Sequence, residues 1–214
     1  MIIKKYSQSF NPKTILFGNG ELVNHPILIK SLKAAKTIIC LDGGVNKLKK
    51  LGHDPDLILG DMDSIDLKPD NYNCEILELL DQSTNDLDKG LQWCLENNKN
   101  DILLTGLSGK RDDHAMAALL SMAVFSQKLK LVMLTNYSTI HCIKKRTKIQ
   151  VDHGQLISIM AKNPLTKIKT NGLHYKLRNE QLASAGHGMS NIATSNQIEI
   201  EASDWIWVFI NHMA

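Results

Sequence analysis

Short apolar runs alternate with helix-period segments through the first two-thirds of the chain. The apolar runs predict six strands, at residues 14–18, 37–41, 56–59, 75–79, 101–105 and 129–134. Helices are predicted between some of them, over residues 24–35, 85–97 and 112–127. Because the strands are apolar without alternation, they suit a parallel sheet that is buried on both faces. Strands that alternate with helices indicate right-handed βαβ units.

The pattern changes after about residue 145. Apolar and polar residues alternate over residues 149–151, 156–160, 167–169 and 198–201, and a β-favouring run follows at 205–210. This alternation is typical of antiparallel strands with one buried face. We therefore expect an α/β fold with two domains. Residues 1–145 would form a Rossmann-like open α/β domain with a parallel sheet, and residues 146–214 a small C-terminal antiparallel β-sandwich.

Composition narrows the class of protein. The 214 residues are 43% hydrophobic and 22% charged, with a formal net charge of +3. The sequence has no broad basic stripe, so we expect no nucleic-acid partner. It also has no apolar run of roughly 18 residues, so we expect no membrane partner. The four cysteines are far apart and lack metal-ligand spacing. These features predict a protein of the reducing cytoplasm.

Acidic and glycine-rich clusters follow several of the predicted strands. They are Asp42–Asn46, Gly60–Ser64, Thr84–Lys89 and Gly106–His114. Carboxylates hold hard cations, whereas glycine backbone, Lys and Arg meet phosphate oxygens. Because the carboxyl ends of parallel strands share one sheet edge, we expect the clusters to converge there. The series predicts an enzyme that acts on a nucleoside triphosphate with Mg²⁺.

Two of these clusters carry candidate metal ligands, and each also fits a plainer interpretation. Asp61 and Asp63 are two residues apart, so an extended backbone would point both carboxylates at one cation. The same pair also fits a polar turn. Asp86 and Lys89 share one helix face, where they fit either a metal-and-phosphate site or a surface ion pair. Asp88 lies off that face and is expected to be exposed to solvent.

The loop Gly106–His114 joins a strand to a helix. Its glycines let backbone amides approach phosphate, and Arg111 adds a bidentate grip. Asp113 and His114 fit contacts with ribose or base, although a capping Asp and a structural His fit equally well. Asp42-Gly43-Gly44 likewise fits a tight turn at a strand end. The loop is not a Walker A motif, because Gly-x-x-x-x-Gly-Lys-Ser/Thr is absent.

In their order along the chain, these motifs resemble those of the thiamine pyrophosphokinase family. The family carries Asp-Gly-Gly-x-Asn, Pro-Asp-x-Ile-x-Gly-Asp-x-Asp-Ser, Asp-x-x-Lys and Gly-x-x-Gly-x-Arg-x-Asp-His. The matching segments here are Asp42–Asn46, Pro55–Ser64, Asp86–Lys89 and Gly106–His114, with further family-like segments at Gly172–Leu177 and Ser190–Asn196. The resemblance spans residues 14 to 210.

The resemblance implies transfer of the pyrophosphoryl group of ATP to thiamine, which gives thiamine diphosphate and AMP. It implies Mg²⁺ as cofactor, held by Asp61, Asp63 and Asp86, with Lys89 on the phosphates. The implied nucleotide-binding residues are Asp42, Gly43, Gly44, Asn46, Gly109, Arg111, Asp113 and His114. The implied thiamine-binding residues are Gln82, Tyr175, Ser195 and Asn196. It also implies a homodimer with active sites at the subunit interface, between the α/β domain of one subunit and the β-sandwich of the other.

The chain departs from the family pattern at a few positions, and two other functions are also compatible with parts of the sequence. Many relatives have Trp where this chain has Tyr175, which reduces the stacking surface. The first alternative is a non-catalytic ATP- or thiamine-binding sensor, which would not need all of Asp61, Asp63, Asp86 and Lys89. The second is a metal-dependent sugar-nucleotide transferase, which the Gly106–His114 loop and the C-terminal sandwich do not favour.

Overall fold

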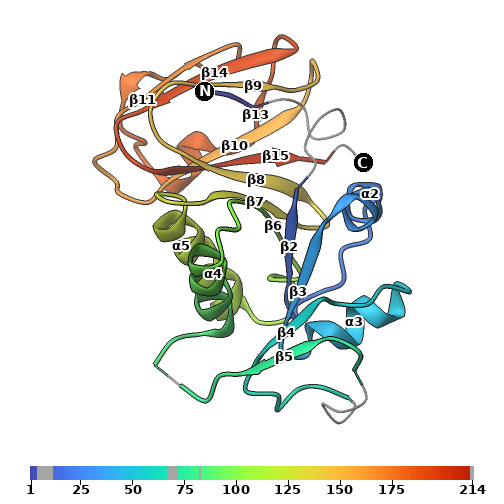
Figure 1. Ribbon diagram of the computed structural model, residues 1–214. Coiled ribbons are helices and arrows are strands. Elements are labelled where there is room, and N and C mark those ends of the chain that lie inside the picture. Colours follow the sequence, from blue (N-terminus) through green and yellow to red (C-terminus); the bar gives the residue numbers. More distant parts are fainter. Residues whose placement is uncertain (4–11, 67–71, 82, 213–214) are drawn as a thin grey trace. The chain divides into compact units, whose positions relative to one another are not determined.

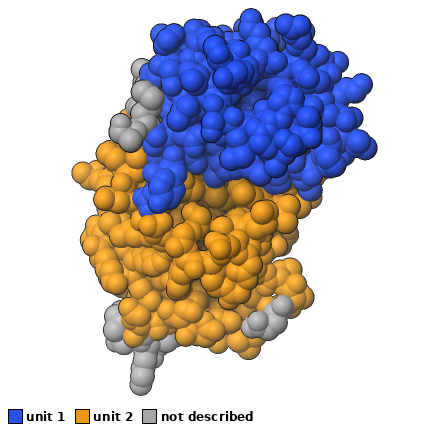
Figure 2. Space-filling view, turned by 180° about the vertical axis from the view of Figure 1, so that it is seen from behind, with its two compact units in different colours: residues 1–10, 136–214 blue, residues 11–135 orange. Residues whose placement is uncertain are grey.

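The strands divide into two sets, and each set forms a separate unit. The computed structural model describes residues 1–3, 12–66, 72–81 and 83–212. One unit comprises residues 11–135, and the other comprises residues 1–10 and 136–214 (Figure 2). The division at 135/136 lies earlier than the predicted boundary at 145/146. The reason is that β8 (Ser138–Ile143) pairs with the C-terminal β15 (Ile206–Asn211).

The first unit is built on six parallel strands that lie side by side in one sheet. In spatial order its strands are β7 (Lys130–Leu134), β6 (Asp101–Thr105), β2 (Thr14–Phe17), β3 (Thr37–Leu41), β4 (Leu57–Gly60) and β5 (Glu75–Glu78). Every neighbouring pair is parallel. The apolar residues of the central strands are buried on both faces, as in Ile15, Leu16 and Phe17. The predicted open α/β unit with a parallel sheet is thus confirmed.

Helices cover both faces of this sheet. Helices α4 (Asp86–Glu96) and α5 (Asp112–Phe125) lie on one side, and α2 (Pro26–Ala34) and α3 (Gly44–Lys50) on the other (Figure 1). Helix α3 was not predicted, because it is short and begins within the glycine turn. The interpretation of Asp113 as the capping residue of α5 is wrong, because Arg111 is the N-cap residue and its side chain makes no capping bond. Asn85, in contrast, caps α4 by accepting from the Asp88 amide.

The second unit is a β-sandwich of two sheets. One sheet has the order β13 (Asn191–Ile192), β10 (Leu156–Ala161), β15 and β8, and all its pairs are antiparallel. The other has the order β1 (Ile2–Ile3), β9 (Thr147–Gln150), β14 (Gln197–Ala202), β11 (Ile168–Asn171) and β12 (Arg178–Glu180). Among the described strands of this second sheet, β1 alone pairs in parallel, with β9. Alternating residues such as Ile157, Ile159, Ile198 and Ile200 form the apolar core of the unit, which is the basis of the predicted sandwich.

The order of the parallel strands creates a switch point in the sheet. The chain runs from β2 outward through β3, β4 and β5, then returns to place β6 and β7 on the other side of β2. The connection therefore changes direction between β2 and β6. Open α/β sheets hold ligands outside the carboxyl ends of their strands at such a switch point. In the part of the chain that the structure describes, no helix is long and apolar enough to cross a membrane.

Candidate nucleotide and metal site

A pocket of about 770 Å³ lies at the carboxyl ends of the parallel strands. The loops that follow β2, β3, β4 and β6 line it, together with the first turn of α4. Eight of the predicted site residues meet there: Asp42, Asp61, Asp63, Asp86, Lys89, Arg111, Asp113 and His114. The convergence that the sequence predicted therefore occurs within a single unit of the protein.

Three carboxylates form a candidate metal site in this pocket. One ligand oxygen from each of Asp42, Asp61 and Asp63 lies within 4.8 Å of the others. The prediction grouped Asp86 with Asp61 and Asp63, whereas this set contains Asp42. The reason is tertiary: β3 and β4 are neighbours, and at Gly60 a Cβ atom would lie only 2.9 Å from the Cβ of Asp42. The backbone between the two aspartates is not extended either, since Met62 has a φ of 64°.

Asp86 lies beside this cluster and is paired with Lys89. The Lys89 Nζ atom is 3.6 Å from the Asp86 carboxylate and donates to the Leu79 carbonyl at 3.1 Å. Only 8% of the Lys89 side chain is exposed, so the pair is not a solvated surface ion pair. Burial raises the pKa of Asp86, Lys89 opposes this rise, and the negative charges of Asp42 and Asp61 add to it. Asp86 is thus held within the electric field of the aspartate cluster.

Asp88 differs from its prediction. It was expected to be exposed, but its side chain is half-buried, and its buried Oδ1 atom has no hydrogen-bond partner among the described residues. The other carboxylate oxygen accepts from the Asn85 side-chain amide at 3.2 Å. The capping contact with Asn85 draws Asp88 back onto the first turn of the helix. A one-residue offset on a helical wheel does not reveal such a local contact.

The loop after β6 supplies the cationic side of the pocket. Gly106 has a φ of 66°, and its backbone conformation turns the chain from the strand toward α5. The Arg111 guanidinium binds both carboxylate oxygens of Asp113, at 3.0 and 2.5 Å. This contact lowers the pKa of Asp113 to about 2, and the His114 amide contributes by donating to the same carboxylate. Arg111 and Asp113 are both exposed in the pocket, where a ligand can reach them.

Four other predicted nucleotide residues support the pocket without lining it. Asn46 donates to the Ser64 carbonyl at 2.9 Å and thereby holds the loop after β4. A Cβ at Gly43 would lie 2.7 Å from the Ser64 carbonyl oxygen, and one at Gly44 would meet the Phe17 carbonyl oxygen. Gly109 has a φ of 79°, and a Cβ atom at this position would contact the Glu21 side chain. Because the loops pack closely, the three glycine positions leave no room for a side chain. Asn46 supports the pocket through its side-chain amide.

One segment of the site, Gly18-Asn19-Gly20, was not predicted from the sequence. All three residues line the pocket. Their signal was present, since a glycine pair follows a buried strand here as it does after β3 and β6. The triplet carries no acidic or basic residue, so it offers backbone groups and the side-chain amide of Asn19. Ser108, Lys110, Thr84 and Asn85 also line the pocket and were not singled out.

Three of the four predicted thiamine residues, Tyr175, Ser195 and Asn196, lie on the β-sandwich unit. Tyr175 is exposed, and its ring lies edge-on to His174 with the centroids 4.7 Å apart. The buried Asn191 holds the Tyr175 backbone: its Oδ1 accepts from the Tyr175 amide at 3.0 Å, and its Nδ2 donates to the Tyr175 carbonyl at 2.6 Å. Ser195 donates to the Gln197 carbonyl, and Asn196 accepts from the His153 amide. Gln82 lies outside the described residues.

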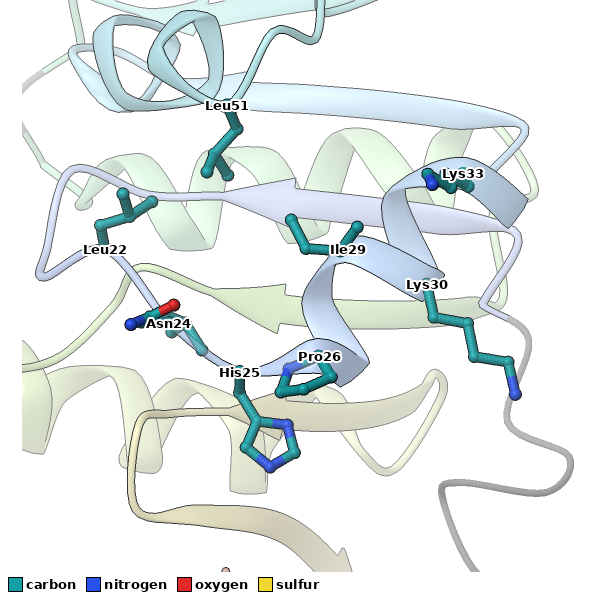
Figure 3. Close-up of a pocket in the computed structure, with 9 residues that line it drawn as sticks. Leu22, Asn24, His25, Pro26, Ile29, Lys30, Lys33 and Leu51 are labelled. Carbon is teal, nitrogen blue, oxygen red and sulfur yellow. The ribbon is translucent and has the colours of Figure 1, made fainter.

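A second hollow in the α/β unit differs in chemistry. It has a volume of about 640 Å³ and lies between the segment before α2, α2 itself and the end of α3. Leu22, Ile29 and Leu51 face it, and Lys30 and Lys33 lie at one side (Figure 3). Its described lining residues include no carboxylate. The described residues of the hollow therefore offer a hard cation no charged ligand, in contrast to the carboxylates of the first pocket.

Two models of protein families match the chain. Residues 28–133 match the model described as "Thiamin pyrophosphokinase, catalytic domain". Residues 139–207 match the model described as "Thiamin pyrophosphokinase, vitamin B1 binding domain". The two matches meet close to the division between the two units. The first covers the parallel strands after β2, and the second covers most of the sandwich.

Relatives and solved structures agree with these matches. The chain is 31% identical over 192 residues to thiamin pyrophosphokinase 1 of Caenorhabditis elegans, covering 79% of this chain and 76% of the relative. It is 29% identical to thiamine pyrophosphokinase 1 of Oryza sativa subsp. japonica, covering 81% of this chain and 78% of that protein. The fold matches thiamin pyrophosphokinase from Candida albicans with a TM-score of 0.83 and 19% identity, covering 99% of this chain and 93% of that one.

The Arg111–Asp113 contact can be tested by titration. Substituting Arg111→Leu removes the guanidinium that lowers the pKa of Asp113, so this pKa should rise from about 2 toward its ordinary value of 3.8. Carbon-13 NMR of the labelled carboxylates between pH 1.5 and 6 would measure it. Lys110→Leu is the matched control and should leave the pKa of Asp113 low. An unchanged pKa in Arg111→Leu would show that the pair does not form in solution.

Proposed function

The chain belongs to the thiamin pyrophosphokinase family, and from this premise we propose how its residues carry out the reaction of that family. The protein is an ATP:thiamine diphosphotransferase. It transfers the pyrophosphoryl group of ATP to the hydroxyl oxygen of thiamine and gives thiamine diphosphate and AMP. The bond from that oxygen to the β-phosphorus forms as the bond between the β-phosphorus and the oxygen retained by AMP breaks, and the hydroxyl proton is released.

One observation supports this assignment more than any other. The aspartate cluster and the cationic loop line the same pocket at the switch point of the parallel sheet. A metal–triphosphate ligand carries charge of both signs, and a pocket with carboxylates on one side and Arg and Lys on the other complements it. A sugar-nucleotide transferase needs the metal ligands but does not account for the vitamin B1 binding match over residues 139–207.

We propose that Mg²⁺ is held by Asp42, Asp61 and Asp63, with Asp86 as an additional ligand. The support is the donor set itself, because hard cations prefer carboxylate oxygens and three of these lie within 4.8 Å of one another. When bound, Mg²⁺ would neutralise charge on the phosphate oxygens. The raised pKa of Asp86 also fits this role, since a nearby cation would relieve the repulsion from Asp42 and Asp61.

The remaining residues would position ATP for attack. Lys89 is nearly buried, which fixes its ammonium against the carboxylate of Asp86 and toward the pocket. Arg111 is exposed and would exchange its contact with Asp113 for phosphate oxygens, leaving Asp113 to accept from ribose. Because phosphoryl transfer needs little covalent chemistry from the protein, such positioning and charge neutralisation would supply most of the catalysis.

For the acceptor, we propose that Tyr175, Ser195, Asn196 and Gln82 bind thiamine. The exposed ring of Tyr175 supports this, because an aromatic face attracts the cationic thiazolium ring.

We also propose a cytoplasmic location, which fits four cysteines that are all free thiols. Cell fractionation would contradict the location if the protein were recovered only outside the cytoplasm.

We further propose a homodimer with active sites at the subunit interface. Helix α5 carries large apolar side chains that are about half exposed, namely Met116, Leu120 and Val124. They recur every four residues and so form one stripe along the helix. Contiguous exposed apolar side chains are typical of protein–protein contacts. The stripe begins next to Asp113 and Ala117, which line the nucleotide pocket, so a subunit that covered it would lie at the site.

Product analysis tests the proposed reaction directly. Incubation of the protein with ATP, Mg²⁺ and thiamine should give equal amounts of AMP and thiamine diphosphate, measured by chromatography. Formation of ADP and thiamine monophosphate would indicate an ordinary kinase. Binding of both substrates without any product would favour the non-catalytic sensor.

Asp63→Asn should reduce turnover by at least about 100-fold, because it removes a charge that would hold the metal opposite the phosphates. Titration with Mn²⁺ in a calorimeter should show weaker binding by the same variant. Asp54→Asn is the matched control, since Asp54 lies before the amino end of β4 and pairs with Lys49. Wild-type turnover and Mn²⁺ affinity in Asp63→Asn would contradict the metal assignment.

Leu120→Lys should convert the proposed dimer to a monomer, because it places a charge in the middle of the apolar stripe. Light scattering after size-exclusion chromatography would measure the mass. Ile29→Lys, which alters a partly exposed apolar residue on α2, is the control and should leave the mass unchanged. A wild-type protein that is monomeric at micromolar concentration would rule out the dimer.

A further inference from the structure

Lys47 holds a loop of the nucleotide pocket, although it does not itself line the pocket. It lies on α3, and its Nζ atom donates to the Asn19 carbonyl at 2.8 Å. Asn19 does line the pocket, between Gly18 and Gly20. The side chain of Lys47 therefore joins α3, which follows β3, to the loop that follows β2.

The loop held by Lys47 is bonded in turn to the loop after β6. The amide of Gly20 donates to the Gly106 carbonyl at 2.5 Å, and the amide of Glu21 donates to the Ser108 carbonyl at 2.7 Å. A Cβ atom at Gly20 would lie 2.5 Å from the Gly106 carbonyl oxygen, so the two backbones are in direct contact. A displacement of Asn19 would therefore displace the Gly106–Arg111 loop as well.

The charges around Lys47 are also informative. Among the residues that the structure describes, its ammonium forms no ion pair with a carboxylate. Burial lowers the pKa of Lys47, and the positive charges of Lys110 and Lys50 lower it further, while Glu21 opposes them. Lys110 lines the pocket. Glu21 offsets these effects only in part, since the pKa of Lys47 is still lowered, and a triphosphate in the pocket would add the missing negative charge.

We propose that Lys47 is a positioning residue for ATP. It fixes the Asn19 carbonyl, and through it the paired loops after β2 and β6, in the arrangement that receives the phosphates. Its positive charge adds to that of Lys110 at the same end of the pocket. This role rests on the proposed use of ATP. It predicts an effect on the affinity for nucleotide and not on the affinity for thiamine.

The test compares three variants by steady-state kinetics and by direct binding. Lys47→Met keeps the length of the side chain and removes its charge and its hydrogen bond. It should raise the KM for ATP about tenfold, which is the order expected for one charge-assisted hydrogen bond. The KM for thiamine should change less than twofold. Lys47→Arg retains both charge and donors and should recover most of the affinity for ATP.

Lys50→Met is the matched control, because Lys50 is an exposed lysine on the same helix. It should leave both KM values unchanged. Calorimetric titration of each variant with ATP, in the absence of thiamine, gives a second measurement that does not depend on product formation. It still decides the role of Lys47 if the wild-type protein binds ATP but forms no thiamine diphosphate, which would refute the proposed function alone.

Two results would overturn the inference. An unchanged ATP affinity in Lys47→Met would show that the contact with Asn19 is dispensable. An equal loss for ATP and thiamine, without recovery in Lys47→Arg, would show that Lys47 supports the fold in general. Thermal unfolding of each variant would identify a folding defect, and Lys47→Arg keeps the comparison possible if Lys47→Met does not fold.

Discussion

The site depends on a direct backbone contact between the loops that leave β2 and β6. These strands are neighbours in the sheet although many residues separate them in the chain, so their loops emerge side by side. The contact leaves no room for a side chain at Gly18 or Gly20, because a Cβ at either position would lie within 2.7 Å of the Gly106 carbonyl oxygen. Glycine at these positions allows the backbone amides to approach the neighbouring carbonyls. This closeness brings Gly18–Gly20 and the Gly106–Arg111 loop into one pocket.

The second constraint is electrostatic. Asp42, Asp61 and Asp63 lie so close together that their charges repel one another, and the same field contributes to the raised pKa of Asp86. Lys89 offsets only part of this field. Repulsion of this kind lowers stability unless a cation is bound, which is a common property of sites that take a metal. The cationic loop around Arg111 presents the opposite sign. The pocket thus presents charge of both signs, which supports the proposed ligand of metal and triphosphate.

In the β-sandwich, the residues that form the stabilising core differ from those that face the solvent. Alternating residues of its strands bury an apolar core, while the residues between them remain outside. Tyr175 stands on this unit as an exposed ring whose backbone is fixed by the buried amide of Asn191. An exposed aromatic side chain with a rigid backbone loses little conformational entropy when it meets a ligand. Tyr175 was predicted from the family resemblance, but Asn191 was given no individual role. Hydrogen bonds between residues sixteen positions apart leave no signal in the sequence pattern.

The sequence by itself determined the succession of elements and the kinds of chemistry at the strand ends. Uninterrupted apolar runs predicted the parallel strands, and alternation predicted the sandwich, because side-chain periodicity follows directly from backbone geometry. Motif order identified Asp61, Asp63, Asp86 and Arg111. Only the tertiary structure brought Asp42 into the aspartate cluster, Gly18–Gly20 into the pocket and Lys47 onto the Asn19 carbonyl. Each of these depends on which strands are neighbours and how closely their loops approach, and long-range pairing of this kind leaves no local signal in the chain.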